Sequence, residues 1–182
     1  EIYNHLELRR ELELADVNPA WRGHSDTETL LACVETWGLE RTLSSSVGMF
    51  AFALWDRQLR TLILARDRAG EKPLYYGWQG DVFLFGSELK ALRAHPAFNA
   101  AIDRDALTLF LRHNCIPSPY SIHKGIFKLP PGTWLEVKQG QREAVPHPYW
   151  SLAEVAERGM ADPFGGSEAE ALDELARLMG RA

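Results

Sequence analysis

Gly48-Met-Phe-Ala-Phe-Ala-Leu-Trp-Asp56 is the stretch that decides the fold of this chain. Its residues are apolar at both alternating positions, a pattern typical of a strand buried on both faces in a layered sheet. Arg57-Gln58 is typical of a hairpin turn, and residues 61–65 are apolar enough to return as a second strand. We therefore expect an antiparallel sheet in the middle of the chain, with other layers packed against both of its faces.

Further hairpins are predicted on the C-terminal side of this stretch. Residues 74–78 and 82–85 flank Gln79-Gly80-Asp81, which has the composition of a turn. A last hairpin around Gly140 would pair residues 132–137 with residues 143–145. Helical patterns precede and follow these strands, so the order of elements predicts an α+β fold in which helices cover at least one sheet.

Five helices are predicted from capping residues and apolar periodicity. They begin near Asn4, Ser25, Ser87, Asp103 and Ser167, and the first is expected to break at residues 16–19. The second is the most clearly marked, because Ser25-Asp-Thr-Glu28 has the spacing of a capping box. Leu30, Cys33, Val34 and Trp37 then recur on one helical face, and Gly38 is a suitable end.

Length and composition limit the classes of protein that this chain can be. Its 182 residues, 46% hydrophobic and 25% charged, suffice for one domain with a hydrophobic core. No apolar run approaches the ~20 residues of a membrane span, so no membrane partner is expected. The formal charge of −5 argues against nucleic acid. Two cysteines are too few for a disulfide framework, which favours a reducing, cytoplasmic setting.

Metal, phosphate-loop and thiol chemistry find little support. The six histidines are scattered without ligand spacing, and neither GxxxxGK[ST] nor GxGxxG occurs, so no metal site is expected. Cys33 lies on the apolar face of the second predicted helix, which favours a buried, inert thiol. Cys115 precedes Ile116-Pro117 in a loop. From the residues alone, the chain is an α+β domain without a self-evident nucleophile.

Asp26 has two interpretations. In a first helical turn, its carboxylate would stabilise the positive end of the helix dipole. Alternatively, it would bind the ammonium group of a substrate in a pocket between a loop and a helix. Spacing alone favours the first interpretation, and the two roles can coexist in one residue.

The charged loop Arg66-Asp-Arg-Ala-Gly-Glu-Lys-Pro73 follows a predicted strand. In one interpretation it is a charged turn, in which Gly70 and Pro73 are the turn-forming residues. In the other it is a fixed loop, in which ion pairs of Asp67 with Arg66 and Arg68 brace a site. Spacing does not choose between these two interpretations.

The order of several strings resembles one protein family. Glu1-Ile-Tyr-Asn4, Gly23-His-Ser-Asp-Thr-Glu28, the 48–56 stretch, residues 66–76, Gly86-Ser-Glu-Leu-Lys-Ala-Leu92 and Leu129-Pro-Pro-Gly132 follow one another as in the glutaminase domain of glutamine-dependent asparagine synthases. These are class II amidotransferases with an N-terminal-nucleophile fold. The resemblance covers residues 1–150 and implies a four-layer sandwich of two antiparallel sheets between helices.

The resemblance also implies an activity. In such enzymes an N-terminal Cys, with its own amino group as base, attacks the side-chain amide of L-glutamine. The ammonia passes to a second domain, where ATP with magnesium activates aspartate as an acyl-adenylate. Asp26 matches the residue that holds the α-ammonium group of glutamine, and Glu1 matches an acidic residue of the same pocket. A buried ammonium group requires such anionic partners.

Other parts of the family pattern are not found in this sequence. The nucleophilic Cys, the Asn-Gly of the oxyanion hole and the Arg that binds the glutamine carboxylate would all precede Glu1, so the sandwich is expected to be incomplete at its N-terminus. Residues 151–182 resemble a connector toward a synthetase domain. We therefore expect an inactive fragment of an enzyme that hydrolyses glutamine and is a possible homodimer.

Two alternatives to this reading stay open at this point. In the first, the chain is a non-catalytic domain that binds glutamine or acts as a scaffold. In the second, the chain belongs to another class II amidotransferase, one that makes an amino sugar or a purine precursor.

Overall fold

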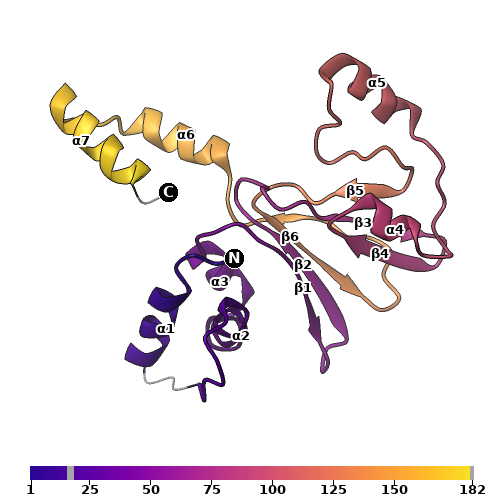
Figure 1. Ribbon diagram of the computed structural model, residues 1–182, viewed down its shortest axis with the longest axis horizontal. Coiled ribbons are helices and arrows are strands. Elements are labelled where there is room, and N and C mark those ends of the chain that lie inside the picture. Colours follow the sequence, from indigo (N-terminus) through magenta and orange to yellow (C-terminus); the bar gives the residue numbers. More distant parts are fainter. Residues whose placement is uncertain (16–18, 181–182) are drawn as a thin grey trace. The chain divides into compact units, whose positions relative to one another are not determined.

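The computed structural model describes residues 1–15 and 19–180, so the predicted helix break at residues 16–18 lies outside the described part. The chain divides into two compact units, Glu1–Trp150 and Ser151–Ala182. The first unit contains both sheets and helices α1 to α5 (Figure 1). The second contains helices α6 (Leu152–Ala161) and α7 (Glu168–Met179).

Two antiparallel sheets form the centre of the first unit. One has the order β1-β2-β6-β7, with β1 at Ala51–Asp56, β2 at Thr61–Arg66, β6 at Thr133–Lys138 and β7 at His147–Pro148. The other has the order β4-β3-β5, with β3 at Tyr75–Gln79, β4 at Val82–Gly86 and β5 at Ile126–Lys128. The predicted hairpins β1–β2 and β3–β4 are therefore confirmed.

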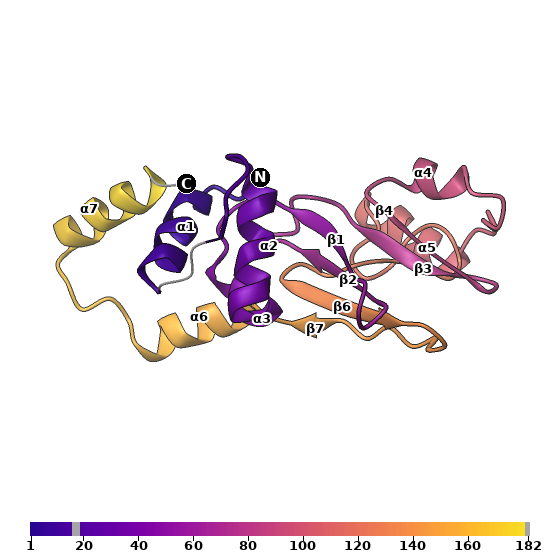
Figure 2. The same ribbon diagram turned by 90° about the horizontal axis from the view of Figure 1, so that it is seen from below.

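The two sheets pack face to face between helices (Figure 2). Leu64 and Leu135 of the first sheet are buried in one cluster with Tyr76 of the second. On the outer face of the first sheet, a second cluster joins it to helices α1 (His5–Leu14), α2 (Asp26–Trp37) and α3 (Leu39–Ser45). Helix α4 (Leu89–Arg93) covers the second sheet, and α5 (Arg104–His113) follows. This arrangement confirms the predicted α+β sandwich of two sheets between helices.

The predicted helix starts are mostly confirmed by their hydrogen bonds. The Ser25 hydroxyl accepts the Thr27 N–H, the Asp103 carboxylate accepts two N–H groups of its own helix, and Ser167 forms a complete capping box with Glu170. The capping box predicted at Ser25 does not form, since the Ser25 hydroxyl accepts the N–H of Thr27 and not that of Glu28. The Glu28 carboxylate accepts the N–H groups of Arg22 and Gly23 instead, because the loop before α2 requires an acceptor.

The expected cap at Asn4 is also wrong. Its side chain makes no capping hydrogen bond to α1. The Asn4 side-chain amide instead donates to the Ser45 carbonyl (2.9 Å) and accepts the Val47 N–H (2.9 Å). It thus ties the start of α1 to the end of α3, a helix that the sequence did not predict.

Two predictions about strands require correction. The stretch 48–56 is not buried on both faces, because Trp55 is 51% exposed. β1 is an edge strand, and the narrower three-stranded sheet packs against Ala51 without covering Trp55. The partner of β6 is β7 and not residues 143–145, since Thr133 lies opposite Pro148 and Trp134 opposite His147.

Gly77 marks a close approach within the second sheet and gives a test of it. A Cβ atom at Gly77 would lie 1.9 Å from the Gly125 carbonyl oxygen, a backbone atom that cannot rotate away. We expect Gly77→Ala to lower the free energy of unfolding by about 1–3 kcal/mol, measured by urea denaturation. Gly159→Ala in α6 is the control, because its Cβ meets nothing within 4 Å. Equal stability of both variants would contradict this packing of β3 against residue 125.

Candidate functional site

The buried carboxylate of Asp67 joins three segments of the first unit. Its side chain is 1% exposed and accepts three backbone N–H groups, from Glu71 (2.9 Å), Lys72 (3.0 Å) and Phe50 (3.3 Å). Its own N–H donates to the Phe50 carbonyl, and its carbonyl accepts the Gly132 N–H. The beginning of β1, the loop after β2 and the beginning of β6 are therefore held together at one residue.

Arg66 and Arg68 satisfy carbonyl groups around the same loop. The Arg66 guanidinium donates to the carbonyls of Lys72 (2.7 Å), Leu129 (2.7 Å) and Gly70. Arg68 donates to the Ser44 carbonyl (2.6 Å), at the end of α3. Burial lowers the pKa of Arg66, while the nearby Asp67 opposes that effect.

The loop is braced, but not by the Arg–Asp pairs that the sequence suggested. Within the described part of the chain, no ion pair joins Asp67 to Arg66 or Arg68. The reason is energetic. Leaving buried backbone polar groups without hydrogen bonds costs more free energy than a local ion pair would gain. The three charged side chains therefore bind main-chain atoms, both of this loop and of other segments.

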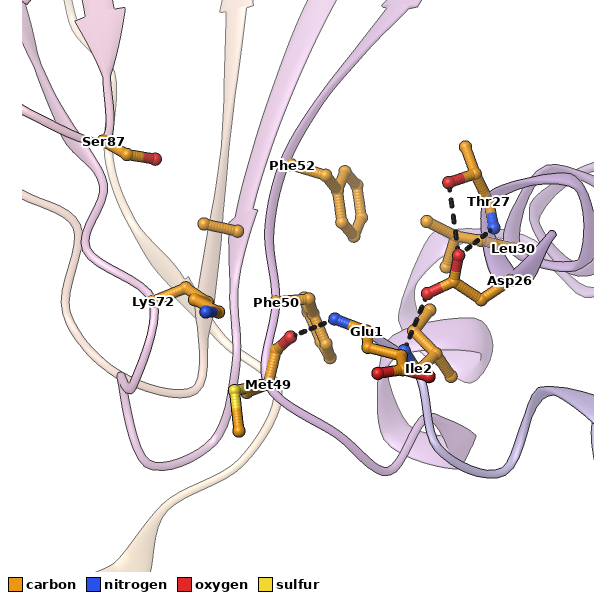
Figure 3. A pocket seen from close by; sticks show the side chains of 11 residues that line it. Glu1, Ile2, Asp26, Thr27, Leu30, Met49, Phe50, Phe52, Lys72 and Ser87 are labelled. Carbon is orange, nitrogen blue, oxygen red and sulfur yellow. Dashed lines mark hydrogen bonds between the residues drawn. The ribbon is translucent and has the colours of Figure 1, made fainter.

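One cavity, of about 270 Å³, lies beside this loop (Figure 3). It gathers residues from five separate segments: the chain start, α2, the beginning of β1, the braced loop and the end of β4. Its lining residues are Glu1, Ile2, Asp26, Thr27, Leu30, Met49, Phe50, Ala51, Phe52, Lys72 and Ser87. The structure thus brings Glu1 and Asp26 to one cavity, as the resemblance implied.

Asp26 is held as a carboxylate at the edge of this cavity. One of its oxygens accepts the Ile2 N–H (2.9 Å), and the other accepts the Thr27 N–H (2.8 Å). The Ile2 hydrogen bond lowers the pKa of Asp26 below its ordinary value, partial burial opposes this, and the Thr27 hydrogen bond adds to the lowering. The side chain is therefore negatively charged at neutral pH.

The segment that carries Glu1 is fixed against the beginning of β1. Ile2 forms a β-bridge with Gly48, and the amino nitrogen of Glu1 donates to the Met49 carbonyl (2.7 Å). A Cβ atom at Gly48 would lie 2.2 Å from the Glu1 carbonyl oxygen, so only glycine permits this approach. The backbone contact keeps the Glu1 side chain at the cavity.

Lys72 and Ser87 also line the cavity, and neither was predicted as a binding residue from the sequence. Each belongs to a string that carried the family resemblance, residues 66–76 and residues 86–92. The signal was therefore present, but only the folded chain brings these two strings together.

Neither cysteine lines the cavity. Cys33 is fully buried, as predicted, and burial raises the pKa of its thiol to about 11. Cys115 is exposed. Among residues 1–15 and 19–180, no group of three or more His, Cys, Asp or Glu side chains is placed to hold a metal ion. None of the helices in that part is long and apolar enough to cross a membrane.

Comparison with known proteins defines the class of this domain. Glutamine phosphoribosylpyrophosphate amidotransferase from Bacillus subtilis superposes with a TM-score of 0.56 over 83% of this chain and 28% of that chain, at 19% identity. The fold is thus the N-terminal-nucleophile fold of amidotransferases. Residues 1–150 match the glutamine amidotransferase domain, and the chain belongs to that family.

The curated relatives include glutamine-hydrolysing asparagine synthetases. A putative asparagine synthetase 2 from Methanocaldococcus jannaschii is 37% identical over 84% of this chain and 29% of its own length. Asparagine synthetase 3 from Bacillus subtilis is 44% identical over 59% of this chain and 17% of its own length. The chain therefore spans less than a third of the length of either relative.

The bracing role of Asp67 can be tested by substitution. Asp67→Ala removes the acceptor of three N–H groups, and each buried group left without a partner costs about 1–3 kcal/mol. We expect the free energy of unfolding to fall by about 3 kcal/mol or more in urea denaturation. The control is Asp81→Asn, since the Asp81 side chain is 88% exposed and its pair with Arg142 contributes ~1 kcal/mol at most. A loss at Asp67 no larger than at Asp81 would show that this carboxylate does not hold the loop.

Proposed function

We propose that residues 1–150 form the glutamine-binding domain of a glutamine-hydrolysing enzyme. The α-ammonium group of L-glutamine is bound by Asp26, with Glu1 as a second anionic group. The position of Asp26 carries this proposal. Its two oxygens are held by the N–H groups of Ile2 and Thr27, and its negative charge lies at a cavity that Glu1 also lines.

The volume of the cavity is suited to a small ligand. Its volume of about 270 Å³ is slightly below the ~300–1,000 Å³ typical of ligand pockets, so it suits a single amino acid. Leu30, Phe50 and Phe52 supply apolar walls. An apolar wall suits the methylene groups of a glutamine side chain, while charged groups orient its ends.

The names of the relatives support an asparagine synthase as the whole protein. In that enzyme, ammonia released from glutamine displaces AMP from an aspartyl-adenylate. Aspartate, ATP and magnesium are assigned to residues outside this chain. The two unpaired cysteines fit the reducing cytoplasm as the setting.

The residues of this chain bind glutamine in the proposal but do not cleave it. In the family mechanism a thiol attacks the side-chain amide, and neither cysteine of this chain lines the cavity. At pH 7 the Cys33 thiol is protonated as well as buried. The 182-residue chain is therefore a binding domain whose catalytic thiol comes from outside these residues.

Glutamine binding tests the first part of the proposal. Titration calorimetry is expected to detect binding of L-glutamine to the 182-residue chain. In Asp26→Asn the ammonium group loses a charged partner, whose hydrogen bond is worth about 1.5–3 kcal/mol, so affinity should fall about tenfold or more.

Glu28→Gln is the matched control for this substitution. Glu28 lies in the same helical turn and also accepts two backbone N–H groups, but it does not line the cavity. Thermal melting of both variants separates loss of binding from loss of folding. Equal affinity in Asp26→Asn and wild type, or equal weakening in both variants, would refute the role of Asp26.

Ammonia release tests the second part. We expect the purified chain to release no ammonia from L-glutamine above the rate in buffer, and Cys33→Ala and Cys115→Ala to leave that result unchanged. A coupled glutamate dehydrogenase assay measures the ammonia. Release that either substitution abolishes would place the nucleophile within this chain.

A further inference from the structure

Arg9 of α1 is a buried cation that does not line the cavity. Only 7% of it is exposed, and its guanidinium lies over the ring of Trp21, with 4.2 Å between Cζ and the ring centroid. A buried guanidinium requires partners for its N–H groups. The glutamine-binding role proposed above does not use this residue.

The partners of Arg9 belong to the loop before α2 and to the beginning of that helix. Its guanidinium donates to the Thr29 hydroxyl oxygen (2.7 Å), the Gly23 carbonyl (2.9 Å) and the Ser25 carbonyl (3.1 Å). A fourth contact, with the Glu28 carboxylate, is longer at 3.4 Å. The planar fork of N–H donors thus holds the loop and the helix start in a fixed relation.

These contacts lie on both sides of Asp26 in the sequence. Ser25 is the cap residue directly before it, and Thr29 follows about one turn later. The Ser25 carbonyl also accepts the Thr29 N–H (3.3 Å), so Arg9 binds two residues that the helix itself joins. The guanidinium therefore fixes the backbone that sets the position of the Asp26 carboxylate.

Arg9 also lies on the helix that follows the first residues of the chain. Ile2 lies just before α1, and its N–H donates to the Asp26 carboxylate (2.9 Å, Figure 3). The contact of Arg9 with Thr29 thus joins the N-terminal part of the chain to α2 at a second point. The two points together fix where Asp26 lies relative to Glu1, and both of these anionic residues line the cavity.

We propose that Arg9 is a positioning residue of the glutamine pocket, which holds residues 23–25 and Thr29 so that Asp26 is correctly placed to bind the ammonium group. This inference rests on the proposed glutamine-binding function and adds to it a residue that does not touch the ligand. Binding groups act best when hydrogen bonds behind them fix their positions. Loss of the Arg9 contacts should therefore lower the affinity for L-glutamine although every lining residue is retained.

Two substitutions of the buried Thr29 separate positioning from stability. Thr29→Val keeps the volume of the side chain but removes the hydroxyl that accepts from Arg9, whereas Thr29→Ser keeps the hydroxyl and loses a methyl group. In titration calorimetry of the 182-residue chain, Thr29→Val should bind L-glutamine about threefold or more weakly than wild type, and Thr29→Ser within about twofold. Thermal melting should show Thr29→Ser to melt about 2–4 °C below wild type. Equal affinities in the two variants, or a weaker affinity in the serine variant, would overturn the proposal.

Substitution of Arg9 itself tests whether it acts through Asp26. Arg9→Lys keeps the charge but loses the planar fork, so glutamine binding should weaken about fivefold. Arg10→Lys is the control, because Arg10 is the next residue of α1 and is exposed, and it should bind glutamine as wild type does. In the double variant Arg9→Lys/Asp26→Asn the two losses should not multiply, and its affinity should lie within about twofold of Asp26→Asn alone.

Failure of this inference differs from failure of the proposed function. All affinities are measured well below the melting temperature of each variant, so that only folded protein is compared. If Asp26→Asn weakens glutamine binding and Arg9→Lys does not, or if the two losses multiply, Arg9 is not a positioning residue and the proposed function stands. If the wild-type chain binds no glutamine, both fail.

Discussion

The interaction on which the rest of the structure depends is the acceptance of three backbone N–H groups by the buried Asp67 carboxylate. A carboxylate that is 1% exposed is costly to bury unless its oxygens are paired, so the segments that supply the donors cannot separate without a large penalty. One donor belongs to Phe50 and another to Lys72, and both residues line the cavity. The same carboxylate therefore stabilises the domain and positions one wall of the site.

The opposite wall depends on the first residues of the chain and on the start of α2. Gly48 allows the Glu1 carbonyl to approach closely, and Ile2 then donates its N–H to Asp26. This hydrogen bond adds a structural role for Asp26 to the helix-start role that its position predicts. A carboxylate in a first helical turn benefits from the helix dipole and from nearby N–H groups, yet it keeps its charge and further lone pairs for a ligand. The structural role of Asp26 is therefore compatible with the binding role proposed for it.

Local patterns predicted the local features well. Turn residues located the β1–β2 and β3–β4 hairpins, and capping residues located α2, α5 and α7. Several of the failures involve partners that are distant in sequence. Asn4 binds residues 45 and 47 instead of its own helix, and β6 pairs with β7 through contacts that no nearby turn predicts. Exposure of Trp55 depends on the width of the facing sheet, which a strand's own pattern does not encode.

The cavity explains why the family resemblance was visible in short strings. Four of the strings contribute lining residues: Glu1 and Ile2, Asp26 and Thr27, the beginning of the 48–56 stretch, and Lys72. Ser87 comes from a fifth. Each of these strings presents side chains at the cavity while its own backbone is held in place, as the contacts of Asp67 and Gly48 show. The cavity thus gathers the groups to which the proposal assigns binding, Glu1 and Asp26, while both thiols lie away from it.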